Sequence, residues 1–523
     1  MKKIKVLLSI LSIAVVMQSC ENSLDIVQPG QVPDETIFQN SKDLEKYLEG
    51  DVYGSLDITS QVGFTSFFTD EVKIGPSNAG QNQGLFRYNL QPDDGFVSGI
   101  WTGNYLTINR VNRLLKQAEK ITPATPAETT TYKNTLAEAR VLRAFAYLNL
   151  MSFFTTDMKD DNALGVILSD TYTDDYTVQL PRVKNSDIWK LIEDDLTFGT
   201  ANLQGAAYQT SVGHRFPSFA SAALVSALRA RMYLYRGNYP LARQYAQDAI
   251  TASGVTLTLG TPIPTGTPSW TNATTVGSWA NTFYSETLTP TPYRKLWSDG
   301  ANGEIIFKLS RPTNGTGGNI ASLYTTNSTA SNGSPLWTMG LNLYSSLTSY
   351  ASDIRSWSFL DPSSTATTSN FIIDKYPGKG TTNLKNDIKV ARLSEMYLIL
   401  AECAIMINND FATAATNIRA VRSARRYVAT AAPLPVYTDR ATALKDILKE
   451  RRVELCFEGH RYIDLRRLGQ VAGVSIDRNA ADDTYNSATP TTISITDHRF
   501  TLPIPSVEIN GNPAIANQQN PGY

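Results

Sequence analysis

The densest group of residues that could do acid–base chemistry lies towards the C-terminus. Glu454, Glu458 and His460 follow one another closely, and carboxylates beside an imidazole are the kind of set that general acid–base catalysis uses. The same stretch interleaves these acids with many arginines. Interleaved charges of both signs on a helix usually have a structural role. We therefore interpret the stretch as a helix, a turn at Gly459 and a short second helix, tied together by ion pairs.

A secreted glycoside hydrolase is the first alternative, and it would need two carboxylates about 5–10 Å apart across a cleft. The sequence has no Gly-x-Ser-x-Gly elbow and no HExxH helix. Its three histidines, His214, His460 and His498, are isolated from one another along the chain. We therefore expect no catalysis, no metal and no cofactor. A structural calcium ion in the Asp- and Asn-rich loops stays open, without a specific signature.

The N-terminus predicts a lipoprotein signal peptide. Three lysines precede the apolar run Val6–Met17, which is the pattern of a secretory signal and is shorter than the ~20 residues that span a membrane. The sequence VMQSC, ending at Cys20, resembles a lipobox. We expect residues 1–19 to be removed and Cys20 to carry lipid that anchors the chain to a membrane. The two remaining cysteines, Cys403 and Cys456, are then expected to be small core residues.

The composition excludes some partners and leaves others open. The formal net charge is −1 and only 18% of residues are charged, so nothing indicates a nucleic-acid partner. Aromatic residues make up 10% of the chain, with 25 Tyr and 7 Trp. Tyr and Trp combine an apolar ring face with a polar tip, which suits stacking on sugar rings as well as core packing.

Hydrophobic periodicity predicts a mainly helical chain that would position these residues. Apolar residues recur at three- and four-residue spacing in 101–120, 137–154 and 187–203. Residues 33–56 are also amphipathic. Residues 57–99 are rich in Gly, Asn, Gln and Phe without such a period, and we expect them to be loop-rich.

Two segments resemble tetratricopeptide units, in which paired helices pack through small residues. The first spans 230–249 and the second lies 172 residues further along. Five positions correspond in register: Gly237, Tyr239, Ala242, Ala246 and Ala249 in the first, and Asn409, Phe411, Ala414, Ile418 and Val421 in the second. The alternative is a pair of unrelated helical hairpins with generic small-residue packing.

The stretch 253–383 between these units has a different character. It is rich in Thr, Ser, Asn, Gly and Pro, and only 305–309 has the apolar run of a strand. Five tryptophans argue against disorder: Trp270, Trp279, Trp297, Trp337 and Trp357. We expect an ordered, loop-built surface carried on a helical scaffold.

Several motifs together resemble the SusD/RagB family. The most specific is ERRVELCFEGHRYIDLRRLG from Glu450, and EARVLRAFAYLNL from Glu138 and RLSEMYLILAECA from Arg392 agree with it. Asp353-Ile354-Arg355 and the final Asn520-Pro521-Gly522-Tyr523 complete the set. The matches follow the family's order over almost all of the mature chain.

The resemblance implies a mainly α fold of tetratricopeptide-like helix pairs, with long loop insertions and a few short strands. It implies a helical N-terminal region at 20–252, a loop-rich ligand face at 253–383 and a C-terminal helical region at 384–523. It also implies a lipid-anchored protein of the outer membrane that faces the exterior. Such a protein captures oligosaccharide for a SusC-like TonB-dependent barrel. A peptide receptor and a pure docking subunit remain alternatives.

The ligand contacts are a chemical prediction, because the family's motifs are structural. Sugar sites combine aromatic platforms with planar polar side chains that make paired hydrogen bonds to hydroxyls. In the first loop these are Asp70, Asn78, Gln81, Asn82 and Arg87. In the second region they are Trp279, Tyr284, Tyr293 and Trp297.

Overall fold

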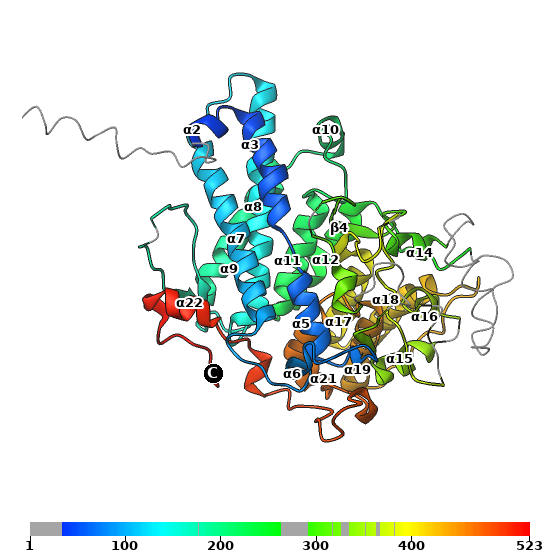
Figure 1. Ribbon diagram of the computed structural model, residues 1–523. Coiled ribbons are helices and arrows are strands. Elements are labelled where there is room, and N and C mark those ends of the chain that lie inside the picture. Colours follow the sequence, from blue (N-terminus) through cyan, green and yellow to red (C-terminus); the bar gives the residue numbers. More distant parts are fainter. Residues whose placement is uncertain are drawn as a thin grey trace, which may run out of the picture.

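The computed structural model describes residues 34–523, apart from 263–290, 326–333 and short gaps at 176, 316, 351, 362–363, 365–366 and 381. The molecule is built mainly from helices (Figure 1), in agreement with the predicted fold class. The N-terminal half contains α2 Asp34–Ile37, α3 Ser41–Tyr47, the π-helix η1 Leu48–Val52, α4 Tyr53–Ser55, α5 Thr59–Phe68, α6 Gln83–Phe86, α7 Gly95–Ala118, α8 Pro126–Phe154, α9 Asn185–Asn202, α10 Ala206–Ser211, α11 Ala222–Tyr235 and α12 Tyr239–Ser253.

The C-terminal half has shorter elements around two further long helices. Its helices are α14 Pro292–Trp297, α15 Leu341–Thr348, α16 Arg355–Ser358, α17 Leu393–Asn408, α18 Phe411–Ala424, α19 Arg440–Glu454, α20 Arg461–Asp464, η4 Leu465–Gly469, α21 Gln470–Ala472 and α22 Ser506–Gly511. The C-terminal segment, red in Figure 1, runs along the lower end of the molecule.

Local sequence signals explain where the long helices begin. α8 starts at Pro126, whose fixed φ suits the first helical turn, and the Thr125 side chain accepts from the Glu128 amide. Ser221 caps α11 and Asn238 caps α12 in the same way. Asp94 caps α7, which begins at Gly95, six residues before the start at 101 that the periodicity predicts. The predicted helices over 101–120, 137–154 and 187–203 are therefore confirmed, with longer N-terminal turns.

The two repeat units form paired helices. α11 packs on α12 and α17 packs on α18, and α12 lies against α17, so the two pairs are neighbours. Ala242, Ala246 and Ala249 are fully buried at the first crossing, and their small side chains allow the close approach. This arrangement confirms the predicted helix pairs.

Six short strands form three separate two-stranded antiparallel sheets in the described part of the chain. β1 Val72–Ile74 pairs with β5 Trp337–Met339, and β2 Leu164–Ile167 pairs with β3 Arg182–Lys184. β4 Ile305–Leu309 pairs with β6 Ile388–Arg392, which confirms the predicted strand at 305–309.

Residues 57–99 are less loop-like than the composition predicts. The ten-residue helix α5 occupies Thr59–Phe68, and its side chains from Gln61 onwards are buried on every face. A helix that is surrounded by protein has no polar face, so it has no amphipathic period to detect. The expectation of a loop is wrong for α5 and holds best between Gly75 and Asn82.

One continuous hydrophobic core runs from Phe38 to Ile515 and joins residues of all three predicted regions of the mature chain. A smaller cluster lies between α17, α18 and α19. Cys403 and Cys456 are buried and free, as predicted for core residues. Among the described helices, none has the length and apolar character that crossing a membrane requires.

Candidate ligand-binding site

The acid–base candidates of the C-terminal stretch lie inside the molecule. The Glu454 carboxylate accepts from three buried guanidinium groups, at 2.7 Å from Arg425, 2.8 Å from Arg392 and 3.0 Å from Arg355. Burial alone would raise the pKa of Glu454, but Arg425 and Arg392 outweigh it and hold that pKa well below its usual range. A carboxylate held in this way is neither a proton donor nor open to a ligand.

Glu458 and His460 lie beside this network. Glu458 is paired with Lys375 at 2.7 Å and with Arg392 at 2.8 Å. Burial lowers the pKa of His460 to about 4, so at neutral pH its imidazole is uncharged and its 3.9 Å approach to Glu395 is not an ion pair. Gly459 adopts a φ of +85° between the two helices. These contacts confirm that the stretch is structural and held by ion pairs.

Two of the predicted aromatic contacts are core residues. Tyr293 and Trp297 are both 0% exposed on the short helix α14. The Trp297 ring lies under the Lys375 ammonium at 4.4 Å, and the Tyr293 ring lies under the Arg425 guanidinium at 4.7 Å. The structure therefore corrects the expectation of an exposed platform at these rings, which instead stack on cations of the buried ion network.

Asp70 is also a structural residue. It is buried, and its carboxylate pairs with Arg461 at 2.8 Å and lies 3.5 Å from Arg452. Burial alone would raise the pKa of Asp70, but these two arginines outweigh it and hold that pKa well below its usual range. The prediction that Asp70 contacts a ligand at the surface is therefore wrong, because Asp70 forms an internal ion pair.

The remaining candidates of the first loop lie close together at the lower end of the molecule. The buried Asn78 side chain shapes the turn, because its Nδ2 donates to the Gln81 carbonyl at 3.0 Å and its Oδ1 accepts from the Gln83 side chain at 2.9 Å. Gln81 and Asn82 are exposed. Arg87 is half-buried and forms a 2.7 Å ion pair with Asp483.

An exposed aromatic ring that the sequence analysis did not single out stands beside this turn. Tyr485 is 60% exposed, and its hydroxyl lies 3.4 Å from the Asn78 carbonyl. We call Tyr485 with Asn78, Gln81 and Asn82 the tyrosine ledge. It combines a ring face with amide groups, as sugar-binding sites do. Trp279, Tyr284 and Cys20 lie outside the described residues.

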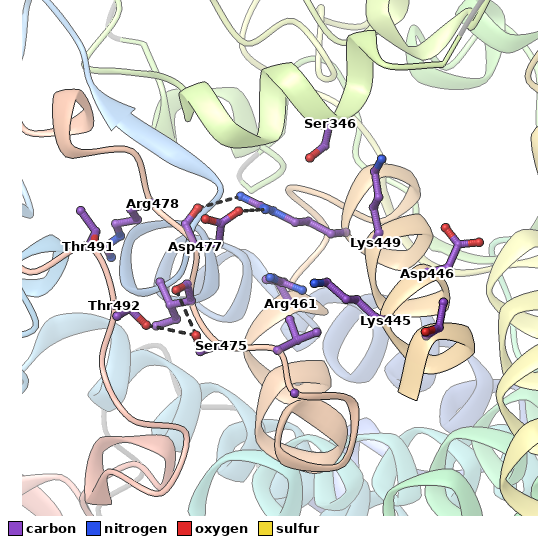
Figure 2. A pocket seen from close by; sticks show the side chains of 15 residues that line it. Ser346, Lys445, Asp446, Lys449, Arg461, Ser475, Asp477, Arg478, Thr491 and Thr492 are labelled. Carbon is purple, nitrogen blue, oxygen red and sulfur yellow. Dashed lines mark hydrogen bonds and ion pairs between the residues drawn. The ribbon is translucent and has the colours of Figure 1, made fainter. Parts of the chain in front are cut away.

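An open cleft of about 670 Å³ lies between α19 and the C-terminal segment. In Figure 2, Lys445 and Lys449 of α19 lie across from Ser475, Asp477 and Thr492 of the C-terminal segment, and Asp446 points away from that segment. Arg478 lines the cleft and donates to the carbonyl of Phe86 in α6, the helix that follows the turn of the tyrosine ledge. The remaining lining comes from Ser346, Thr442, Arg452, Arg461, Gly473, Val474, Ile476 and Thr491.

The charges of the cleft are only partly neutralised. Arg461 is paired with Asp70, and Arg452 is paired with Asp477 at 3.2 Å. Within the described residues, Lys445 and Lys449 have no carboxylate partner, and Lys449 donates only to the Ser349 hydroxyl at 3.2 Å. The cleft therefore offers cations and hydroxyl groups that can donate to hydroxyl or carboxylate oxygens.

Comparison with known proteins agrees with this architecture. The family model described as SusD family matches residues 316–523, and the model described as starch-binding associating with outer membrane matches residues 67–234. A SusD-like protein of Bacteroides ovatus is 26% identical over 270 residues, which cover 48% of this chain and 45% of that protein. The chain thus spans about half the length of the curated relatives it matches.

Solved structures extend the likeness to almost the whole chain. A SusD superfamily protein from Bacteroides thetaiotaomicron has a TM-score of 0.70 at 22% identity and covers 92% of this chain and 100% of its own. A laminarin-binding SusD-like protein has a TM-score of 0.63 at 21% identity and covers 93% of this chain and 100% of its own. At these identities the structures establish the fold alone. The two family models, which match residues 67–234 and 316–523, show that the chain belongs to the SusD family.

Proposed function

We propose that this protein is a surface lipoprotein that binds glycans and delivers oligosaccharides to a SusC-like TonB-dependent barrel of the outer membrane. The observation that carries the proposal is the open polar cleft, and the exposed ring of Tyr485 on the same C-terminal segment supports it. A sugar offers an apolar ring face and adjacent hydroxyls, which match an aromatic face and planar polar groups. Family membership supports glycan binding as the function of this site.

A non-catalytic role is part of the proposal. The acids that could have formed a hydrolytic pair, Glu454 and Glu458, are bound to arginine and lysine in the interior. In the cleft, Asp446 accepts from Arg422 at 2.8 Å and from Tyr437 at 2.7 Å, and Asp477 is paired with Arg452. Binding without bond cleavage is the function that this arrangement supports.

The test is a binding and cleavage experiment on the mature chain with Cys20→Ser, which removes the proposed lipid site. Affinity electrophoresis and calorimetry against a panel of polysaccharides, laminarin included, would be combined with an assay for new reducing ends. We expect saturable binding and no reducing ends. New reducing ends would overturn the non-catalytic proposal, and neither binding nor cleavage would favour a peptide ligand or a pure docking role.

Replacement of Tyr485 locates the site. Tyr485→Ala removes the exposed ring, and we expect affinity for the bound glycan to fall about tenfold, or about 1.4 kcal/mol. Tyr208→Ala is the matched control, because Tyr208 lies on α10 at the opposite end of the molecule (Figure 1). Equal affinities of the two variants would place the glycan elsewhere.

The lipid anchor and the transporter are tested in membranes. We expect the full-length chain to lose membrane attachment with Cys20→Ser. From detergent-solubilised membranes, the lipidated protein should copurify with a large TonB-dependent barrel. A pull-down that returns no such barrel would count against the delivery role.

A further inference from the structure

A second polar cluster lies at the end of the molecule opposite the cleft, near α3 and α10 (Figure 1). It consists of Glu45, Glu49 and His214, which we call the upper cluster. One ligand-type atom of each side chain lies within 4.8 Å of the others. His214 is only 1% exposed, and its Nε2 lies 2.7 Å from Glu49 Oε1. The cluster takes no part in the proposed glycan site.

The two glutamates point to one place because of their spacing. Glu45 and Glu49 are four residues apart, one turn along α3 and the π-helix η1, so their side chains share a face. π-helical turns occur frequently at functional sites. The Oε1 atom of Glu45 is buried and has no hydrogen-bond partner among the described residues. An acceptor without a donor is costly to bury, and a cation would satisfy it.

The imidazole is held in a fixed orientation. Its Nδ1 lies 2.9 Å from Oε1 of the buried Glu138, and its ring stacks on Phe219 with centroids 4.1 Å apart. Glu138 is itself fixed, because it accepts from Tyr53 at 2.5 Å and from Asn134 at 2.7 Å. A histidine whose second nitrogen is bound to a carboxylate is the usual arrangement behind a metal ion. Here it directs Nε2 towards the two glutamates.

The charges of the cluster also favour a cation. Three carboxylates, those of Glu45, Glu49 and Glu138, surround one imidazole. A divalent cation would relieve the repulsion between these carboxylates.

We propose that Glu45, Glu49 and His214 form a binding site for a divalent metal ion of the zinc class. His214 Nε2 and one oxygen of each glutamate supply three ligands, and water completes a tetrahedral shell, as zinc prefers. Calcium is disfavoured because it takes six to eight oxygen ligands. The ion joins the N-terminal helix α3 to the loop between α10 and α11 and so stabilises this end of the molecule.

The competing account is that a protonated His214 is itself the cation that bridges Glu49 and Glu138. Calorimetry distinguishes the two on the mature, tag-free chain with Cys20→Ser, treated with chelator and titrated with Zn²⁺ at pH 7.5. We expect one equivalent of Zn²⁺ to bind, with a rise in Tm that Ca²⁺ does not give. Absence of stoichiometric Zn²⁺ binding would overturn the proposal.

Two variants assign the site without disturbing the core. Glu45→Gln and Glu49→Gln should each weaken Zn²⁺ binding at least ~10-fold and abolish the rise in Tm. Glu45 has an oxygen that lacks a partner within the described part of the chain, and Glu49 is 42% exposed, so both variants should fold. His498→Gln is the control, because it removes an exposed imidazole elsewhere in the chain. Binding that survives both glutamate variants but is lost with His498→Gln would overturn the assignment.

Discussion

At the scale of single residues, this molecule keeps many charges in its interior. Arg355, Arg392 and Arg425 are buried around Glu454, and Glu304 extends the network through Arg392 and Arg425. Removing charges from water is expensive, and the cost is offset only when each charge finds good partners. The loops of the C-terminal half are therefore fixed by ion pairs as much as by apolar packing. Trp297 and Tyr293 contribute to the same network through their ring faces.

His460 gives this interior a measurable pH dependence. Burial lowers its pKa to about 4, as do Arg231 and Arg451, and Glu395 and Asp464 only partly oppose them. Between about pH 6.5 and pH 4 the unfolded chain binds a proton that the folded chain excludes, so the free energy of unfolding falls as the pH is lowered. The loss should be on the order of 3 kcal/mol.

Chemical denaturation at a series of pH values checks this prediction. His460→Gln should flatten the stability profile between pH 6.5 and 4 relative to the unchanged chain. His498→Gln, which replaces an exposed imidazole, should keep the original profile. A profile of His460→Gln that runs parallel to that of the unchanged chain would contradict the assignment.

Only some of these residue roles are predictable from the sequence. The structural role of Glu454 and Glu458 is predictable, because mixed charges repeat along a helix. The burial of Tyr293 and Trp297 is not predictable. An aromatic ring can pack in a core or stack on a ligand, and an irregular segment has no hydrophobic period that would distinguish the two. Tyr485 was missed for the same reason, since only the contact with the distant Asn78 distinguishes it.

At the scale of elements, small residues set how closely the helices approach. Gly199 of α9 faces Val141 of α8, and a Cβ at Gly199 would meet a Val141 methyl at 2.6 Å. Gly103 of α7 has open space where its Cβ would be. The repeats were predictable because small residues recur at fixed spacing, whereas α5 was not, because it is buried on every side.

Alanine at these two glycines should have opposite effects on stability. Gly103→Ala should raise the free energy of unfolding by up to about 1 kcal/mol, since alanine is the better helix former. Gly199→Ala should lower it by about 1–3 kcal/mol, because the branched Val141 cannot move aside without strain. Urea denaturation of both variants checks the pair. Equal stabilisation by both would show that α8 and α9 separate freely.

At the scale of the whole molecule, the two polar sites occupy opposite ends of one continuous core (Figure 1). The C-terminal segment lines the cleft together with α19, and its Tyr485 contacts the turn before α6. The upper cluster lies where the N-terminal helix meets α10 and α11. Because the core joins residues far apart in sequence, hydrophobic patterning could predict the helices but not which loops share an end. The cleft and the tyrosine ledge could therefore be located only from the folded structure.

The net charge of −1 gives the molecule no overall attraction for an anionic polymer, so any preference for one must come from the cleft. Among the residues that the structure describes, Lys445 and Lys449 have no carboxylate partner, and we expect acidic glycans to bind more tightly than neutral ones of equal length. The double variant Lys445→Ala with Lys449→Ala should remove that preference and its salt dependence. Tyr485→Ala should instead weaken the binding of acidic and neutral glycans alike. Calorimetry at two salt concentrations measures this, and an unchanged acidic preference in the double variant would exclude the cleft as its source.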